Sequence, residues 1–563
     1  MPSTAPETIP PEIDLLLRRW ALPPERVPDL LGLLAAQGEG GTACPLPAAT
    51  PVDPAAWGQA VVTDPAIPAP LLLRRHAGAT YLQSWRYHSA EQAIAAQLQA
   101  RATQPATRLG RPAAEWLAAL GSDQVNDLQG RAITCALQHT LALITGGPGT
   151  GKTHTLARLL ALLLADQPGH RPVIRLAAPT GKAAERMRQA IMAAATRLPA
   201  SLPADTAEHL TAAAATACTL HTLLGFNPIT ERCRHNEHTP LRCDVLIVDE
   251  CSMVDTLLWQ ALLRALPPAT RLILLGDPHQ LESVAAGDVL GALVRHARRH
   301  PDAALASVWV ELRESQRFKH RADIGTLAHA IVTFDAPTAV ALLQARRAPD
   351  LGADGLVWLG EHNGRFSWEV LAPAVREAVV TVADATQPAT ALAALDRVRL
   401  LTAHREHLLG AAGVNASIDR QLRQRPGLVR PPNEPIIINH NDAETGLTNG
   451  SVGVIMNDAA GRAAFFPAAD SQLAPRRFPL GQLPEYSPAW ALTIHRAQGS
   501  EFDHVVVILP TESSPLATRE LIYTAITRAK HQVYLWGSTT TVIAALSERA
   551  LRCTLLEACL DRD

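Results

Sequence analysis

A glycine-rich segment in the first third of the sequence has residue types that bind phosphate. Residues 146–153 read GGPGTGKT, which fits the pattern G-x-x-x-x-G-K-[ST], and they follow the apolar run LALIT that begins at Leu141. Glycines let backbone N–H groups surround a β-phosphate, and the N-terminus of the following helix adds a positive dipole end. We expect Lys152 to neutralise phosphate oxygens and Thr153 to bind Mg²⁺. The predicted ATP-binding residues here are Gly146, Gly147, Pro148, Gly149, Thr150, Gly151, Lys152 and Thr153.

Two adjacent carboxylates end a second apolar run, DVLIVDE, which begins at Asp244. At the edge of a buried strand, Asp249 and Glu250 would be costly without a cation to compensate their charge. Asp249 suits the Mg²⁺ shell, and Glu250 suits a base that orients and deprotonates the attacking water. On its own, the pair is explained equally well as an acidic turn after a strand. Its combination with the glycine-rich loop favours the catalytic interpretation.

A third apolar run, RLILLGD, ends at Asp277 and is followed by Pro278, His279 and Gln280. Ligands of open α/β sheets bind at the carboxyl ends of the strands. Gln280 is therefore predicted to sense the γ-phosphate or the attacking water. Three strands would deliver polar residues to one edge of one sheet, and this convergence predicts a site that hydrolyses ATP with Mg²⁺ as its metal.

The elements that must position these residues alternate in type along the chain. Between about residues 115 and 310, the three runs above and a fourth, VIRLAAP at 173, alternate with helical stretches, which predicts βαβ units and a parallel sheet buried on both faces. A second set of runs, VRLLTAH at 398, HVVVILP at 504 and QVYLWG at 532, predicts a second sheet. The predicted fold class is α/β, with two tandem domains built on parallel sheets.

Two other regions differ from this pattern. Residues from about 433 to 488 contain the short strands PIIINHN, GSVGVIM and AAFFP between Asn/Gly turns, and predict a small antiparallel barrel inserted in the second α/β domain. The first 105 residues contain helical segments at 13–20, 27–37 and 90–102 and no chemical motif, so we predict a small helical docking domain. The predicted domains are 1–105, 106–310 and 311–563.

The composition is that of a globular protein, and the cytoplasm is its expected location. Of the 563 residues, 47% are hydrophobic and 18% charged, and no apolar run approaches the roughly 20 residues that span a bilayer. The formal net charge is −2, so any contact with DNA must come from local placement of residues. The N-terminus has prolines and acidic residues where a signal peptide has basic and apolar ones, so secretion is not expected.

The cysteines indicate reduced thiols and leave one alternative open. There are eight, with no C-x-x-C pair, which fits a cytosolic protein better than a disulfide framework. Cys233, His235, His238 and Cys243 are ligand types at short spacing, but the spacing matches no common zinc pattern. A polar surface loop is the preferred interpretation of this cluster, and metal binding is the alternative.

Eight segments follow one another in the order of the motifs of a known family. They are GGPGTGKT, LAAPTGKAAERM, TLHTLLG, LIVDECSMVD, LLGDPHQLESV, ESQRF, LTIHRAQGSEFD and YTAITRAK. In this form they resemble RecD-like superfamily 1 DNA helicases, and the resemblance covers about residues 125 to 540. It implies two RecA-like P-loop domains that close on ATP, with single-stranded DNA running across both, and an SH3-like β-barrel as the insertion.

The resemblance also implies further residues at the nucleotide. Gln129 corresponds to the adenine reader, and Gly499 and Glu501 match positions that touch the nucleotide from the second domain. Arg317 and Arg528 resemble the two arginines that reach the γ-phosphate. Such arginines stabilise charge that grows in the transition state, and their supply from another domain makes hydrolysis depend on domain closure.

Contacts with DNA are implied in the same way. Small polar side chains, backbone groups and imidazole rings suit a grip on DNA that is independent of sequence. The positions matched are Pro179, Thr180, Lys182, Thr219, His221, Thr493 and His495. The family implies movement from 5′ to 3′. Its complex-forming members work at double-strand DNA ends with RecB-like and RecC-like subunits, and the short, motif-poor N-terminus favours that kind over a stand-alone helicase.

Two rival classes of function agree less well with the sequence. The common metal-dependent nuclease core needs a carboxylate two residues before a lysine, and none of the four lysines has one. A scaffold that binds ATP only for assembly would not need Lys152, Glu250 and Arg528 together. We therefore expect an ATP hydrolase without a nuclease site of its own.

Overall fold

The computed structural model of the chain describes most of residues 23–561. The residues outside the description within this range are 49, 51–52, 54–56, 58–60, 64–68, 108–109, 121–126, 167–171, 320, 348–354, 361–363, 427–430, 443, 469–472, 513, 515 and 549–551. The helix predicted at 13–20 lies outside the described residues. No described helix is long and apolar enough to cross a membrane.

The first parallel sheet has six strands in the order β12, β5, β11, β10, β6, β7. Every residue of β5 and β11 is buried, because helices cover both faces, and this explains their continuous Leu/Ile runs. The four predicted runs form its four central strands, and the two edge strands were not predicted. The strands are β5 (Leu141–Gly146), β6 (Ile174–Ala178), β7 (Cys218–Thr219), β10 (Val245–Val248), β11 (Arg271–Gly276) and β12 (Trp309–Leu312).

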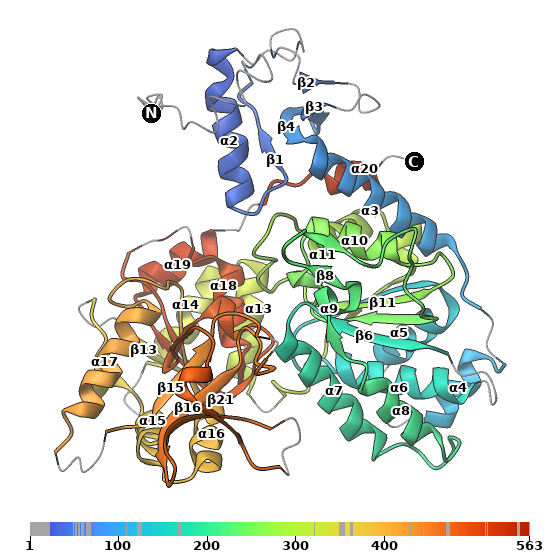
Figure 1. Cartoon of the computed structure of the whole chain (residues 1–563). Coiled ribbons are helices and arrows are strands. Elements are labelled where there is room, and N and C mark those ends of the chain that lie inside the picture. Colours follow the sequence, from blue (N-terminus) through green and yellow to red (C-terminus); the bar gives the residue numbers. More distant parts are fainter. Residues whose placement is uncertain are drawn as a thin grey trace.

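The second parallel sheet has five strands in the order β13, β22, β21, β14, β20. The predicted runs are its central strands, and the mixed α/β class is confirmed. Figure 1 shows the two sheets in separate lobes that face each other. The strands are β13 (Gly355–Gly360), β14 (Val398–Thr402), β20 (Ala491–Thr493), β21 (Phe502–Ile508) and β22 (Ala529–Trp536).

Helices connect and cover both sheets. Those that pack with the first sheet are α3 (Trp85–Thr103), α4 (Ala113–Leu120), α5 (Asp127–Gln138), α6 (Lys152–Ala165), α7 (Gly181–Ala195), α8 (Thr206–Ala214), α9 (Leu220–Leu224), α10 (Thr256–Ala265), α11 (Val289–Arg299) and α12 (Ala304–Ser307). Those around the second are α13 (Ala322–Thr333), α14 (Ala336–Ala345), α15 (Pro373–Asp384), α16 (Pro388–Arg397), α17 (Ala411–Arg423), α18 (Arg519–Ile526) and α19 (Thr539–Ser547).

An antiparallel sheet is inserted in the second domain between α17 and β20. Its order is β18, β17, β16, β15, β19, and it encloses a small core of its own that includes Ile438, Ile455 and Phe466. The antiparallel insertion agrees with the sequence prediction; its likeness to an SH3 barrel rests on the family resemblance. The strands are β15 (Glu434–Ile438), β16 (Val452–Asp458), β17 (Gly461–Phe466), β18 (Arg476–Pro479) and β19 (Tyr486–Pro488).

The N-terminal region is not purely helical, and that prediction is corrected. Helices α2 (Val27–Gly38) and α3 are present, but between them lies a four-stranded sheet in the order β1, β4, β3, β2. Its hairpin turns at Ala77 and Gly78, which have φ of 48° and 80°, the positive values that a tight hairpin turn requires. The remaining strands are β1 (Ala43–Pro45), β2 (Val61–Val62), β3 (Leu71–His76) and β4 (Ala79–Ser84).

The predicted domain borders differ from the packing at both ends of the chain. Helix α3, placed before the border at 105, packs Ile94 and Leu98 into the core of the first sheet. The last segment, with α20 (Leu556–Leu560), leaves the second domain and returns to the first, where α20 lies beside α3 (Figure 1). There the Thr42 N–H donates to the Cys553 carbonyl over 2.8 Å. Sequence patterns do not report such returns, because they describe only local periodicity.

Leu555→Ala is expected to lower the apparent melting temperature of the full chain. Leu555 is 1% exposed and packs with Ala43 and Ala558, so truncation leaves a cavity where the N-terminal sheet meets the last segment. Such a loss costs roughly 2–5 kcal/mol. Differential scanning fluorimetry measures the shift, and Leu516→Ala, at a side chain that is 56% exposed, is the matched control. Equal melting temperatures for the two variants would contradict this packing.

Candidate nucleotide-binding site

The glycine-rich loop lies between β5 and α6 and has the backbone that its sequence requires. Gly149 and Gly151 have φ of 76° and 88°, the left-handed region that favours glycine. A Cβ at Gly149 would lie 2.4 Å from Cβ of Arg317, and one at Gly151 would lie 2.6 Å from Nε2 of Gln129. Lys152 Nζ donates to the carbonyls of Gly146 and Gly147 over 2.5 and 3.2 Å. The loop thus fits a phosphate cradle that no larger residue could form.

Asp249 and Glu250 are adjacent carboxylates after β10, and a bound cation would compensate their negative charge. Asp249 Oδ1 accepts a 2.8 Å hydrogen bond from the N–H of Glu250, which has a φ of 54°. Burial and the adjacent Glu250 raise the pKa of Asp249 to about 6, against the lowering effect of Lys152. A half-buried carboxylate with a raised pKa, which lines the same cavity as Thr153, suits a hard cation with oxygen ligands.

Gln280 lies in a buried hydrogen-bond chain that reaches the second domain. Its Nε2 donates to Asp277 Oδ2 over 3.0 Å, and its Oε1 accepts from Arg528 Nη2 over 2.7 Å. The Tyr523 hydroxyl also donates to Asp277 Oδ2, over 3.1 Å. Burial and Asp277 raise the pKa of Tyr523 well above its ordinary value, so the phenol keeps its proton. Gln280 and Arg528 therefore occupy linked positions on opposite sides of the cleft.

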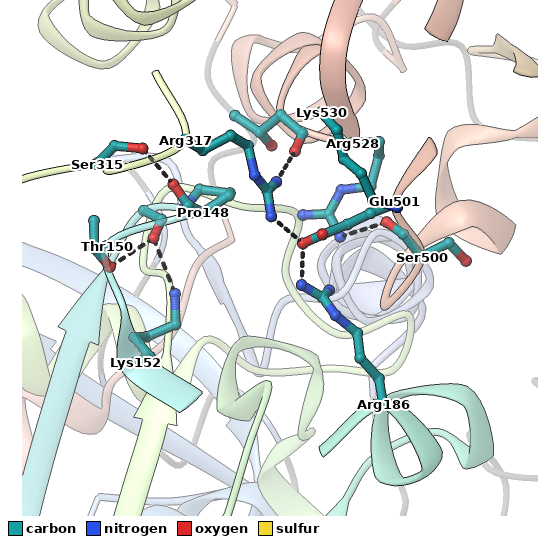
Figure 2. A network of polar contacts seen from close by, with 12 residues as sticks. Pro148, Thr150, Lys152, Arg186, Ser315, Arg317, Ser500, Glu501, Arg528 and Lys530 are labelled. Atoms are coloured by element: carbon teal, nitrogen blue, oxygen red, sulfur yellow. Dashed lines mark hydrogen bonds and ion pairs between the residues drawn. The ribbon is translucent and has the colours of Figure 1, made fainter. Parts of the chain in front are cut away.

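Arginines from two parts of the chain meet one carboxylate in the cavity. Figure 2 shows Arg317 and Arg186 both directed at Glu501, and Arg317 Nη2 lies 2.5 Å from Glu501 Oε1. Arg317 Nη1 also donates to the Thr527 carbonyl over 3.1 Å. Burial would raise the pKa of Glu501, but Arg186 and Arg317 outweigh it and lower that pKa to about 2. Glu501 is therefore ionised at neutral pH, and its charge is compensated by Arg186 and Arg317.

The loop before Arg317 is bonded directly to the glycine-rich loop. Ser315 Oγ donates to the Pro148 carbonyl over 2.9 Å, as Figure 2 shows, and the Gln316 N–H donates to the Gly149 carbonyl over 2.9 Å. This loop joins the two domains, since β12 precedes it and α13 follows it. Arg317 is therefore held next to the phosphate cradle by the segment that links the domains.

Most of the predicted nucleotide residues line one cavity of about 190 Å³ between the domains. Its lining includes Gly147, Pro148, Gly149, Thr150, Gly151, Lys152, Thr153, Asp249, Glu250, Gln280, Arg317, Glu501 and Arg528. The predicted residues Gly146, Gln129 and Gly499 do not line it. Arg186 belongs to it and was not predicted, although it occurs in the quoted segment LAAPTGKAAERM; Tyr523, in YTAITRAK, was missed in the same way.

The predicted DNA contacts gather where strands of both sheets end. Pro179 and Thr180 follow β6, Thr219 ends the neighbouring β7, and Thr493 ends β20. Two of the threonines also cap helices: Thr180 Oγ1 accepts from the Ala183 N–H over 3.2 Å, and Thr219 Oγ1 accepts from the Thr222 N–H over 3.1 Å.

The other three predicted DNA residues have exposed side chains. His221 lies 5.1 Å from Phe226, centroid to centroid and edge to face, and His495 follows β20. Lys182 directs Nζ toward the Phe502 ring of the second domain, 5.5 Å from its centroid. The strand ends thus bring all seven positions to corresponding edges of the two sheets.

The Cys/His cluster does not assemble as a ligand set. Cys233 lies in the short strand β9 (Arg232–Cys233), paired with β8 (Phe226–Asn227), whereas Cys243 is buried in the first core. Among the described residues, one group of three His/Cys/Asp/Glu side chains is compact enough for a metal, and it is His296, His300 and Asp561 at the junction of α11 with the last segment. Neither set belongs to the nucleotide cavity.

A phosphate cradle at the end of β5, carboxylates at the end of β10, and arginines from the linker and from a second α/β domain define a P-loop ATPase completed by its partner domain. Comparison with known proteins agrees. Residues 129–286 match the AAA domain family, and residues 488–536 match the UvrD-like helicase C-terminal domain.

Relatives identify the family. The RecBCD enzyme subunit RecD of Mycolicibacterium smegmatis is 38% identical over 519 residues, 89% of this chain and 86% of that protein. RecD of Haemophilus influenzae is 35% identical over 73% of this chain and 69% of its own length, and the ATP-dependent RecD2 DNA helicase of Deinococcus radiodurans is 30% identical over 74% and 50%. The chain therefore belongs to the RecD family of superfamily 1 and is an ATP-dependent DNA helicase.

Proposed function

We propose that this chain hydrolyses ATP with Mg²⁺ to move 5′ to 3′ along single-stranded DNA, as the motor subunit of a RecBCD-type enzyme that processes double-strand ends for recombinational repair. The observation that supports the motor most directly is the convergence of Lys152 from one domain with Arg317 and Arg528 from the linker and the other domain on one cavity. A cavity completed in this way makes hydrolysis depend on domain closure, and closure is the movement that a translocating motor needs.

The roles proposed for the chain's own residues follow from their positions. Lys152 and the glycine-rich backbone bind and orient the phosphates, while Thr153 and Asp249 would hold the metal. Glu250, at the left-handed turn after β10, holds the attacking water and takes its proton. Arg317 and Arg528 stabilise the charge that grows on the phosphoryl oxygens. Bound Mg²⁺·ATP supplies the electrophilic phosphorus and the free energy.

The proposed DNA path crosses the carboxyl ends of β6, β7 and β20. Exposed Lys182, His221 and His495 would contact phosphates or bases, and the half-buried Pro179, Thr180, Thr219 and Thr493 would shape the path. Two of these threonines are also helix caps, so their substitution is expected to perturb local structure as well as DNA binding.

A subunit role is favoured over a stand-alone one by the pattern of similarity. The RecD subunit of the Mycolicibacterium smegmatis RecBCD enzyme is 38% identical over 89% of this chain and 86% of its own length, whereas the RecD2 helicase is 30% identical over 74% and 50%. We therefore propose RecB-like and RecC-like partners, with independent helicase activity as the second candidate. Co-expression of the three chains followed by affinity purification of this one separates the two: a stoichiometric complex supports the subunit role, and absence of a complex supports the stand-alone one.

The purified full chain is expected to show an ATPase stimulated by single-stranded DNA and no nuclease activity. The readouts are phosphate release with and without oligo(dT), and the fate of end-labelled linear duplex DNA with Mg²⁺. The variant Glu250→Gln is the control, since it keeps the cavity but loses the base. Metal-dependent cleavage by the wild-type chain, absent from a mock purification, would contradict the assignment.

A further inference from the structure

Helix α7 spans the distance between the proposed DNA path and the nucleotide cavity. Thr180 caps its N-terminus, Lys182 lies in its first turn, and Arg186 follows one turn later. Residues four apart lie on the same face of a helix, so Lys182 and Arg186 form one edge of α7. The first of them belongs to the proposed DNA contacts, and the second lines the cavity.

The second domain packs along that edge with three residues of one short segment, Gly499, Glu501 and Phe502. A Cβ at Gly499 would lie 3.4 Å from Cβ of Ala183 and 3.5 Å from Oγ1 of Thr180. Glu501 pairs with Arg186, and the Phe502 ring lies under Nζ of Lys182. The segment 499–502 therefore follows the first turns of α7, and every one of these contacts crosses from one domain to the other.

One oxygen atom of Glu501 links this edge of α7 to Arg317, which lies beside the glycine-rich loop. Oε1 of Glu501 accepts from both Arg186 and Arg317, as Figure 2 shows. The Glu501 side chain is 13% exposed, as is that of Arg317, whereas Arg186 is 43% exposed. Two guanidinium groups that share one carboxylate oxygen cannot move independently. A shift of either one changes the electrostatic attraction and the space that remain for the other.

We propose that the ion pair between Arg186 and Glu501 couples DNA binding at the start of α7 to the position of Arg317 in the nucleotide cavity. Both are positioning residues. DNA bound at Thr180 and Lys182 fixes the position of α7 relative to segment 499–502. Through its ion pair with Glu501, Arg186 then determines where Glu501 lies, and Glu501 in turn determines where Arg317 lies. The inference rests on the proposed function, since it assumes DNA at α7 and ATP in the cavity.

Coupling between two binding sites is reciprocal, so the effect of nucleotide on DNA affinity measures the effect of DNA on nucleotide binding. If DNA favours the position of Arg317 that suits nucleotide, then nucleotide must favour DNA by the same factor, typically about 5–150-fold. The factor is the ratio of the Kd for a fluorescent oligo(dT), measured by anisotropy, without and with saturating Mg²⁺·AMP-PNP. We expect a factor of at least about fivefold for the wild-type full chain.

Arg186→Gln is expected to bring this factor close to one, and the double variant Arg186→Gln/Glu501→Gln to lower it no further. Arg186→Lys, which keeps the charge but not the forked donor, is expected to give an intermediate factor. Arg188→Gln is the control on the same helix: Arg188 bonds Glu185 within α7 over 2.6 and 2.8 Å, and its removal should leave the factor unchanged. Melting temperatures establish that each variant is folded.

The possible results distinguish the coupling role of Arg186 from the proposed motor function on which it rests. A wild-type factor in Arg186→Gln, or an equal loss in Arg188→Gln, overturns the coupling role. If Arg186→Gln weakens DNA binding equally with and without AMP-PNP, Arg186 is a DNA contact and the inference is also overturned. Failure of the wild-type chain to bind oligo(dT) or AMP-PNP overturns the proposed function instead.

Discussion

Lys152→Gln is expected to abolish ATP hydrolysis and DNA unwinding while leaving assembly with partner subunits intact. Lys152 is the first residue of α6, and its ammonium lies at the carbonyls of the glycine-rich loop, where phosphate oxygens would be held. A neutral amide of similar length cannot compensate the charge that grows there. Removal of one such group costs about 10²–10³-fold in rate, and phosphate release in the presence of oligo(dT) measures it.

The matched control for Lys152→Gln is Lys530→Gln. Lys530 pairs with Asp503 at 3.7 Å with 45% of its side chain exposed, and it lines no part of the nucleotide cavity. An exposed pair of this kind contributes at most about 1 kcal/mol, so ATPase activity should remain near that of the wild type. Unwinding at the wild-type rate by Lys152→Gln would overturn the motor function, because no other lysine lines the cavity.

The sequence predicts which residues line the candidate nucleotide cavity where the structural requirement is local. The glycine-rich loop needs positive φ at Gly149 and Gly151, so its residue types and spacing are fixed by the backbone they form. Asp249 and Gln280 follow buried apolar runs, and parallel strands bring their carboxyl ends to one edge. These residues could be predicted because each needs only its own strand and the loop that follows.

The residues that sequence reasoning missed depend on contacts between distant parts of the chain. Arg186 and Tyr523 occur in recognised segments, but Arg186 gains its role from Glu501 and Tyr523 from Asp277, each across the domain cleft. The hydrophobic periodicity of a sequence does not indicate which distant side chains are in contact. The same reason explains the missed return of the last segment, whose Leu556 and Leu560 complete a core that otherwise belongs to the first sheet.

Arg528→Lys is expected to reduce the DNA-stimulated kcat for ATP hydrolysis by about 10³–10⁵-fold, the range measured for arginines that complete phosphoryl-transfer sites. Arg528 is 2% exposed, and its guanidinium donates to Gln280 Oε1, the Thr524 carbonyl and, over 3.4 Å, the Ser500 carbonyl. A lysine has one nitrogen and cannot make these bonds in their present directions. Gln280 would lose its link to the second domain.

Burial makes this substitution more severe than a loss of hydrogen bonds. It lowers the pKa of Arg528, but arginine begins so high that the group keeps its charge. Lysine begins about two to three units lower, so the same desolvation acts on a lower starting pKa, although Glu250 and Glu501 oppose it. In Arg528→Lys the cavity would lack the forked donor, and its remaining cation would be less strongly protonated than arginine.

A measurement of kcat at saturating ATP, together with the Kd of AMP-PNP, tests this account of Arg528. We expect the loss in kcat, with a change in nucleotide affinity below about tenfold, because the arginine acts mainly on charge that develops during the reaction. Arg313→Lys is the control: Arg313 is 76% exposed and pairs with Glu311, so its rate should match the wild type. If Arg528→Lys kept a kcat within tenfold of the wild type at an unchanged melting temperature, closure of the second domain would have to act through Arg317 alone.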